Sequence, residues 1–330
     1  MLISRFGHGA AIAAAAVLLL ILAAPAAART KWADVRVVTH TGRTLAEFRQ
    51  YTGPLAVRAS RKADCFGTDN PSSGKRYRLH DPNALGIVKD ATASDRALRP
   101  LLISDAFLDD GFGLGVCSIG GFDTVDFSYW YLAVNRIAAS TGASQTPIGD
   151  GDSVLWYFTS GAESGSPREL ALLGPASAKP GAPFTVKAKR YADNGKSSPA
   201  AGVRVSADGK PIGRTGPDGE LKATLANSAM LQATGTKSDV PSNRVQVCVS
   251  ADSGRCPDAH GKTIYGSEHG DRIKGTRGPD HISARGGADV VNLRSGGEDR
   301  VSCGGGRDQV ILEHGDRDDH VASSCERVRR

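Results

Sequence analysis

Five aspartates near the carboxyl end of the chain recur at nearly constant spacing, with intervals of 9, 9, 10 and 9 residues. They are Asp271, Asp280, Asp289, Asp299 and Asp308. Two positions after each aspartate stands a β-branched apolar residue: Ile273, Ile282, Val291, Val301 and Val310. A carboxylate supplies the hard oxygen that Ca²⁺ prefers, and a regular repeat brings such oxygens together on successive turns. The pattern therefore predicts a cation-binding site.

Glycines are frequent just ahead of each aspartate, where a tight turn is expected because glycine tolerates positive φ. The turn residues whose carbonyl oxygens would complete the ligand set are Gly275, Gly278, Gly287, Gly297 and Gly306. The apolar residue after each aspartate would begin a short strand and point into a shared core. Aspartates two repeats apart would then share an ion. The predicted pairs are Asp271 with Asp289, Asp280 with Asp299, and Asp289 with Asp308.

Residues 264–321 resemble the hemolysin-type calcium-binding repeats of RTX proteins in the order and spacing of these residues. The resemblance implies a short parallel β-roll, which we place at residues 256–330, with calcium ions as its partners. The alternative is a metal-free solenoid that acts as an interaction module. In that alternative the aspartates hydrogen-bond to turns or pair with arginines.

The repeats also depart from the family pattern. His269 stands where the family has Gly, and Ala284 and Arg285 replace the paired glycines of another turn. Arginines among the acids are expected to weaken cation binding. The longer interval before Asp299 is expected to offset one turn, and Asp319 is expected to lie outside the register.

The first 28 residues predict a signal peptide. Arg5 supplies the positive start, Ala10–Ala24 the apolar stretch, and Ala26–Ala28 a small-residue cleavage site. No later apolar run is long enough for a transmembrane anchor. We therefore expect a secreted, extracellular protein.

The cysteines are even in number, which favours disulfides outside the cytosol. They are Cys65, Cys117, Cys248, Cys256, Cys303 and Cys325. Sequence alone leaves several connectivities open, and local pairing is the simplest of them. It predicts the bridges Cys65–Cys117, Cys248–Cys256 and Cys303–Cys325, the last of which would hold the end of the β-roll.

Two stretches of small and polar residues, 160–167 and 250–254, indicate linkers. They divide the chain after the signal peptide (1–28) into units of 29–163, 168–250 and 256–330. The predicted fold class is mainly β and multidomain: an α+β domain, a β-sandwich and the parallel β-roll.

The first unit combines strands with one helix. Alternating apolar residues predict strands over 35–38, 126–135 and 150–158. Ser94 is the expected N-cap of a short helix over 94–102.

Aromatic strands in this unit resemble the transcobalamin-like C-terminal domain, through Trp-x-x-x-Val-Asn and Gly-Asp-x-Val-x-Trp-x-Phe within residues 126–158. That family is of unknown function in exported bacterial surface proteins, and in cobalamin carriers the domain closes over the ligand held by a helical barrel. This chain has no such barrel. We expect Trp130, Tyr131, Trp156 and Tyr157 to be core residues rather than a ligand platform.

The second unit is predicted to be all strand and turn. Its expected strands are 184–189, 202–207, 221–225 and 245–249. Asp208-Gly209 indicates a hairpin, and Asp218-Gly219 indicates a second turn. The pattern resembles the immunoglobulin-like modules of bacterial surface proteins, which usually act as spacers.

Composition and motifs limit the function further. A formal net charge of +6 is too mild and mixed for a nucleic-acid binder. The sequence lacks Gly-x-Ser-x-Gly and His-Glu-x-x-His, which argues against a hydrolase. The sequence favours a secreted, non-catalytic binding or structural protein with Ca²⁺ as cofactor, acting on cell-surface or extracellular macromolecules. The alternative is a small-ligand carrier that uses the first unit.

Overall fold

The computed structural model describes residues 30–67, 69–160, 166–250, 260–314 and 318–330. The signal peptide predicted at 1–28 lies outside these residues. The described residues form a mostly β structure, and none of their helices is long and apolar enough to span a membrane.

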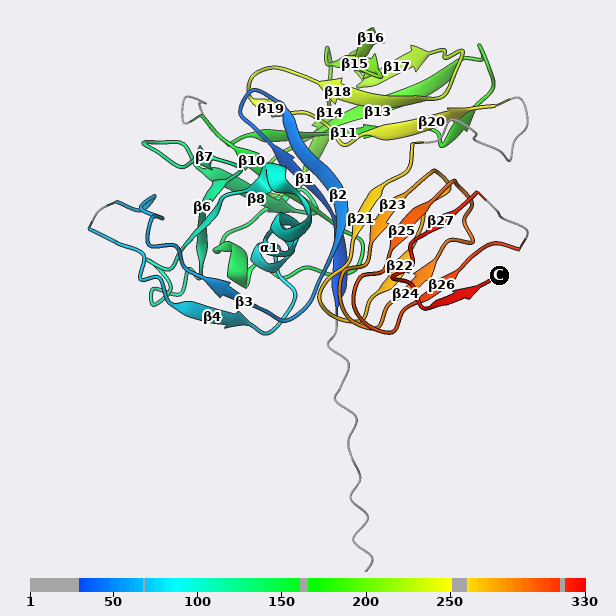
Figure 1. The fold of residues 1–330 in the computed structure, drawn as a ribbon. Helices are drawn as coiled ribbons and strands as arrows, with labels where there is room; N and C mark the ends of the chain where they lie inside the picture. The colour runs from blue at the N-terminus through cyan, green and yellow to red at the C-terminus, as the bar shows by residue number, and fades with distance from the viewer. Residues whose placement is uncertain (1–29, 68, 161–165, 251–259, 315–317) are drawn as a thin grey trace, which may run out of the picture.

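One sheet of nine strands joins the N-terminal residues to the C-terminal repeats (Figure 1). From edge to edge its strands are β27 (His320–Val321), β25 (Arg300–Ser302), β23 (His281–Ser283), β21 (Thr263–Tyr265), β2 (Thr44–Thr52), β1 (Lys31–Val38), β10 (Asp152–Phe158), β8 (Trp130–Val134) and β9 (Ile137–Ala138). Strand β1 pairs antiparallel with β2 and parallel with β10, whereas β2 pairs parallel with β21. The strand predicted over 35–38 is part of β1, whereas the ranges predicted over 126–135 and 150–158 contain the shorter strands β8 and β10.

Helix α1 (Ala84–Ser94) packs against β1 and β2 and buries Leu85, Ile87 and Val88. It begins after Asn83, whose side chain accepts a 2.9 Å hydrogen bond from the N–H of Gly86. The helix predicted over 94–102 is wrong, because Ser94 ends α1 instead of capping a new helix.

The predicted segment contains Pro100, which has no N–H and disrupts a helix interior. It forms a 3₁₀ turn, η1 (Arg96–Leu98), and strand β5 (Leu101–Ser104) instead. The other elements of this unit are β3 (Leu55–Arg58), β4 (Arg76–Leu79), β6 (Gly115–Ile119), β7 (Phe122–Asp123) and η2 (Ala143–Gln145). The predicted bridge Cys65–Cys117 is present, with 5.4 Å between the two Cα atoms.

The middle residues form two five-stranded sheets that share one cluster of buried apolar side chains. One sheet contains β11 (Arg168–Leu173), β13 (Phe184–Tyr191), β14 (Ser197–Pro199), β17 (Glu220–Ala223) and β19 (Asp239–Val240). The other contains β12 (Ser177–Ala178), β15 (Arg204–Ala207), β16 (Lys210–Arg214), β18 (Ala229–Thr234) and β20 (Val245–Val249). The predicted Asp208-Gly209 hairpin joins β15 to β16, with positive φ at both residues.

Buried polar contacts attach this middle part to the nine-stranded sheet. Arg36 on β1 and Glu169 on β11 form an ion pair, with 2.7 Å between Nη2 and Oε1 and with 7% and 6% of the side chains exposed. Arg36 also donates to the carbonyl of Pro241. The Tyr131 hydroxyl donates a 2.9 Å hydrogen bond to Oδ1 of Asp193.

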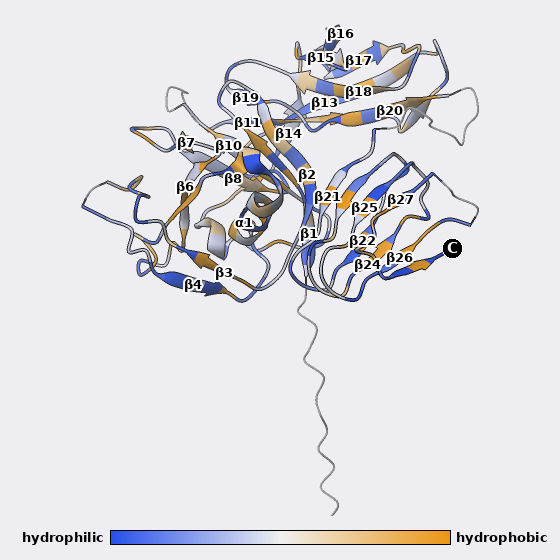
Figure 2. Cartoon of the chain, viewed as in Figure 1, coloured by the Kyte–Doolittle hydropathy of each residue, from blue (hydrophilic) through white to orange (hydrophobic). Residues whose placement is uncertain are grey.

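The C-terminal repeats form a coil in which the chain alternates between two sheets of parallel strands. Strands β22 (Arg272–Lys274), β24 (Val290–Asn292), β26 (Gln309–Ile311) and β28 (Arg327–Arg329) form one sheet, and β21, β23, β25 and β27 extend the nine-stranded sheet. The apolar residue two positions after each repeat aspartate is buried between the sheets, as predicted. Figure 2 shows these residues as short hydrophobic stretches flanked by hydrophilic ones.

Strand β2 covers the first coil of the repeats. The Gln50 side chain donates a 3.0 Å hydrogen bond from Nε2 to the carbonyl of Gly266. The Tyr51 hydroxyl donates a 3.0 Å hydrogen bond to the carbonyl of Arg272, and the Tyr51 ring packs in the same buried cluster as Ile273. The N-terminal unit thus caps an end of the solenoid that would otherwise expose apolar side chains.

The other predicted disulfides lie toward the C-terminus. Cys303 and Cys325 are bonded, with 5.1 Å between their Cα atoms, at the end of the repeats. Cys248 is disulfide-bonded, and its predicted partner Cys256 lies outside the described residues.

Candidate metal centre

The acidic residues of the repeats stack in two columns, each on one side of the coil. The first acidic column precedes β22, β24, β26 and β28 and consists of Asp271, Asp289, Asp308 and Glu326. The second acidic column precedes β23, β25 and β27 and consists of Asp280, Asp299 and Asp319. The five aspartates of the predicted repeat are all at most 1% exposed.

Backbone amides hold the first acidic column in register. The N–H of Asp271 donates to Oδ1 of Asp289, and the N–H of Asp289 donates to Oδ1 of Asp308, both at 2.8 Å. The N–H of Asp308 donates to Oε2 of Glu326, again at 2.8 Å. Asp289, Asp308 and Glu326 therefore each accept a hydrogen bond from the main chain of the preceding coil with one oxygen.

The second acidic column repeats this arrangement. The N–H of Asp280 donates to Oδ1 of Asp299 at 2.8 Å, and the N–H of Asp299 donates to Oδ1 of Asp319 at 2.9 Å. The predicted neighbours two repeats apart are thus confirmed as neighbours in space, although sharing of an ion by each pair stays a prediction. The extra residue before Asp299 is accommodated within a turn, and the strand register of β25 is kept.

Asp319 lies in the register, so the expectation that it falls outside the repeat is wrong. Glu326 continues the first acidic column in the same way. A signal was present in the sequence, because Val321 and Val328 stand two positions after these acids. The irregular spacing between repeats concealed it.

Asp280 differs from the aspartates of the first acidic column in what its remaining oxygen contacts. In the first acidic column, Asp289 Oδ2 and Asp308 Oδ2 are buried and have no hydrogen-bond partner among the described residues. Asp271 Oδ1 also lacks such a partner; burial raises the pKa of this carboxylate, and the nearby Thr30 acts more weakly in the opposite direction. Unpartnered buried carboxylate oxygens are costly, and a cation would satisfy them.

Asp280 in the second acidic column has both oxygens occupied. Oδ1 accepts hydrogen bonds from the N–H of Lys262 at 2.6 Å and from the Thr276 hydroxyl at 2.7 Å. Oδ2 accepts from the N–H of Thr276. The turn containing Thr276 therefore satisfies its own aspartate without a metal ion.

Burial and neighbouring charges raise the pKa of two carboxyl groups in the first acidic column. Burial raises the pKa of Asp289 to about 7, and the neighbouring charges of Asp271 and Asp308 act in the same direction. Burial raises the pKa of Asp271 as well. A carboxylate held between two others in a buried column is stabilised in its ionised form by a divalent cation.

Close stacking of coils requires glycine at four of the five predicted turn positions, because a Cβ on Gly278, Gly287, Gly297 or Gly306 would lie less than 3.0 Å from backbone atoms of the neighbouring coil. Gly287, Gly297 and Gly306 have φ values of +108°, +115° and +143°, whereas Gly275 and Gly278 are not left-handed. A Cβ on Gly306 would lie 1.7 Å from the carbonyl oxygen of Gly287. The turns of successive coils therefore approach each other backbone to backbone just ahead of the aspartates, and only glycine allows the approach.

Two departures from the family pattern contact the N-terminal unit. The ring Nε2 of His269 lies 2.7 Å from the carbonyl oxygen of Pro54. Arg285 pairs with Glu268 at 2.6 Å and with Asp90 of α1 at 3.5 Å.

The arginines do not neutralise the first acidic column. Among the described residues, none forms an ion pair with Asp271, Asp289 or Asp308. These aspartates therefore form the main-chain hydrogen bonds that the metal-free alternative expects, but they do not form the arginine pairs that it also expects.

A metal ion in the repeats would depend on main-chain ligands. Within the described ranges, no three His, Cys, Asp or Glu side chains gather into one possible metal site. Two carboxylates from adjacent coils and the carbonyl oxygens of the turns are the oxygen donors that the first acidic column offers. Oxygen-only ligation suits Ca²⁺.

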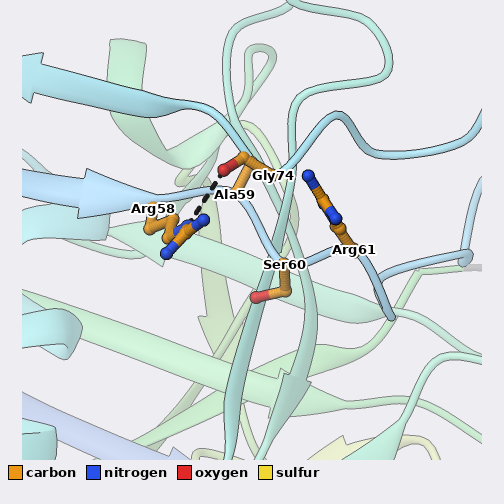
Figure 3. Close-up of a pocket in the computed structure, with 5 residues that line it drawn as sticks. All are labelled: Arg58, Ala59, Ser60, Arg61 and Gly74. Atoms are coloured by element: carbon orange, nitrogen blue, oxygen red, sulfur yellow. Dashed lines mark hydrogen bonds between the residues drawn. The ribbon is translucent and has the colours of Figure 1, made fainter.

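The N-terminal unit offers a different surface. A pocket of about 340 Å³ lies in this unit, and Arg58 donates a 3.0 Å hydrogen bond there to the carbonyl of Gly74. In Figure 3 the side chain of Arg61 points away from Arg58. The lining of the pocket, completed by Ala59 and Ser60, holds no acid, imidazole or thiol that could activate the hydroxyl.

The aromatic residues of this unit are in the core, as expected. Trp130, Tyr131, Trp156 and Tyr157 are at most 9% exposed. They therefore provide no exposed stacking platform for a ligand.

Comparison with known families matches two parts of the chain. Residues 265–297 match the RTX calcium-binding nonapeptide repeat, and residues 106–160 match a domain of unknown function, DUF4430. The second match covers the strands that carry the transcobalamin-like resemblance, but its description assigns no ligand. No curated protein and no solved structure matches the chain. The chain therefore carries calcium-binding repeats of the RTX type, built onto the sheet of a domain of unknown function.

Proposed function

We propose that this chain is an extracellular, non-catalytic protein whose C-terminal β-roll is stabilised by calcium bound along the first acidic column. The observation that carries the proposal is the set of buried, unpartnered oxygens on Asp271, Asp289 and Asp308. Disulfides and RTX-type repeats are typical of extracellular proteins, which supports the location.

The proposed sites lie between successive coils of that column. One would use Asp271 with Asp289, and the other Asp289 with Asp308, with turn carbonyls near Gly287 and Gly306 completing each set. Asp280 with Asp299 is the weaker candidate, because Thr276 and Lys262 already occupy both oxygens of Asp280. Asp289 is the one residue common to both proposed sites.

Calcium would supply positive charge where carboxylates crowd one another. The residues of the chain position the oxygens: each main-chain N–H fixes one oxygen of the next carboxylate, so the other oxygen stays free for the ion. Calcium that binds only the folded roll, and not the unfolded chain, stabilises the fold. The gain is roughly 2.7 kcal/mol for one site when the calcium concentration is about a hundredfold above the Kd.

The units proposed for the chain are 29–163, 168–250 and 256–330. In this arrangement the first unit is a scaffold, because β2 supplies the edge and the cap on which the roll is built. The second unit would be a spacer of the immunoglobulin-like kind, fixed to the scaffold by Arg36 and Glu169. The partners would be extracellular or cell-surface macromolecules.

Thermal unfolding of the full chain tests the proposal. The protein is unfolded in 1 mM (about a hundredfold excess over a ~10 µM site) calcium, in the same concentration of magnesium, and in chelator. We expect calcium to raise Tm by several degrees and magnesium to have little effect, since Mg²⁺ gives up its water ligands reluctantly. Equal Tm values in calcium and chelator would rule out the calcium-stabilised roll.

A further inference from the structure

The outer face of the roll carries an open groove of about 770 Å³, and no residue of the first acidic column lines it. Its floor is the part of the nine-stranded sheet formed by β21, β23, β25 and β27 (Figure 1). The side chains that point outward from these strands line it. They are Thr263, Tyr265, His281, Ser283, Arg300, Ser302 and His320.

These side chains form two parallel rows across the strands. One row pairs Thr263 with His281, His281 with Arg300, and Arg300 with His320. Neighbouring members of a row are one strand spacing apart, about 4.8 Å. The groove is therefore a periodic array.

The second row consists of hydroxyl groups. It pairs Tyr265 with Ser283, and Ser283 with Ser302. The Tyr265 ring is held in place by Phe48 of β2, with 5.5 Å between ring centroids. One row is thus rich in nitrogen donors and the other in hydroxyls.

The donors in the centre of the groove are unused within the described parts of the chain. Arg300 and His281 are exposed, and neither side chain forms an ion pair or hydrogen bond with another described residue. The hydroxyls of Ser283 and Ser302 are likewise without a partner among those residues. An exposed guanidinium between two imidazoles is available to an anionic ligand.

Acidic groups lie at the rims of the groove. Glu298 is 3.7 Å from the ring Nε2 of His320, and Asp319 lines the same end, where one of its oxygens is fixed by the N–H of Asp299. Asp95 lies toward Tyr265 at the other end and raises the pKa of that phenol, although less than burial does. The middle of the groove floor, where Arg300 lies on β25, is its most positive part.

We propose that this groove binds an acidic polysaccharide, a linear sugar chain bearing carboxylate or sulfate groups. Arg300 would bind the anionic group, and the rows of serine and imidazole groups would hydrogen-bond to sugar hydroxyls. A flat, periodic array of donors fits a periodic, extended ligand better than it fits a compact one. The cation at the centre gives the charge complementarity that a neutral glycan would not use.

Binding to the full chain in the presence of calcium tests the proposal. The probes are polygalacturonate, which carries carboxylates, heparin, which carries sulfates, and neutral dextran, measured by isothermal titration calorimetry. The variant Arg300→Gln removes the central charge. Its matched control is Arg272→Gln, because Arg272 also follows a repeat aspartate and is exposed, but lies on β22 outside the groove.

We expect at least one acidic polymer to bind, with an affinity about tenfold lower for Arg300→Gln and nearly unchanged for Arg272→Gln. Dextran should not bind. The more responsive of the two acidic polymers identifies the anionic group.

Several results would overturn the proposal. These are no binding of either acidic polymer, equal losses in the two variants, or dextran binding as strong as that of the acidic chains. Tighter binding of single-stranded DNA than of either polysaccharide would also overturn it. Circular dichroism of both variants shows whether the fold is kept.

Discussion

The backbone N–H of Asp271 donates a 2.8 Å hydrogen bond to Oδ1 of Asp289, one full coil and 18 residues later in the chain. The same contact recurs between Asp289 and Asp308. One oxygen of each aspartate therefore belongs to the architecture of the coil. The other oxygen of Asp289 and of Asp308 is buried without a partner among the described residues, and it is there that we propose the calcium ions bind.

Asp319 should contribute to the stability of the roll. The change Asp319→Ala removes the acceptor for the N–H of Asp299, at a cost of about 1 kcal/mol. Urea unfolding measures the loss, and Glu313→Ala, at an exposed position nearby, serves as the control. Equal stability of the two variants would show that Asp319 does not act as a repeat aspartate.

The stability of the calcium-free protein should depend on the ionisation of Asp289. Its pKa is about 7 in the folded protein and near 4 in an unfolded chain, so ionisation disfavours the fold. Stability in chelator should fall as the pH rises from about 4 to about 7. Thermal unfolding at pH 5 and pH 8 measures this, and Asp289→Asn should show a smaller decrease.

Calcium should make the loss of stability between pH 5 and pH 8 smaller than it is in chelator, because the bound ion stabilises the ionised carboxylate. An identical pH response of Asp289→Asn and the unaltered protein in chelator would show that Asp289 does not carry the effect.

Arg285 should attach the roll to the N-terminal unit rather than oppose cation binding. The change Arg285→Gln removes the contacts with Glu268 and with the largely buried Asp90, and we expect a loss of roughly 1–3 kcal/mol. Arg277→Gln, at an exposed turn position, should change stability by no more than about 0.5 kcal/mol. Tighter calcium binding by Arg285→Gln without loss of stability would support the opposite role.

The sequence predicted the features of the roll that repeat at fixed spacing. The interval from Asp271 to Asp289 and the apolar residues Ile273 and Val291 were sufficient to predict the stacked coils and their inward-facing side chains. Asp319 was misplaced because its repeat is longer. An inserted residue in a turn leaves the stacked strands in register, but it breaks the fixed spacing on which the sequence prediction depends.

The interface between the roll and the first unit could not be predicted in the same way. Gln50 and Tyr51 lie more than 200 positions before their partners Gly266 and Arg272, and no local pattern marks them as a cap. The helix was misplaced for a different reason. Its start is set by the Asn83 side chain, a single hydrogen bond that the periodicity of apolar residues does not reveal.

The most direct test of calcium binding in the first acidic column compares Asp289→Asn with Asp280→Asn in the full chain. An Asn at 289 keeps an oxygen for the N–H of Asp271 and replaces the unpartnered oxygen with an amide. An Asn at 280 instead presents an amide to donors, because both oxygens of Asp280 accept hydrogen bonds. The substitution at 289 should therefore affect calcium binding, whereas the substitution at 280 should affect the stability of the calcium-free protein.

The measurement is calcium binding by isothermal titration calorimetry, with unfolding in chelator measured in parallel. We predict that Asp289→Asn abolishes or severely weakens calcium binding while its calcium-free form is at least as stable as the unaltered protein. Asp280→Asn should be less stable in chelator but should still bind calcium. Unchanged binding by Asp289→Asn, or loss of binding only in Asp280→Asn, would contradict the assignment of calcium to the first acidic column.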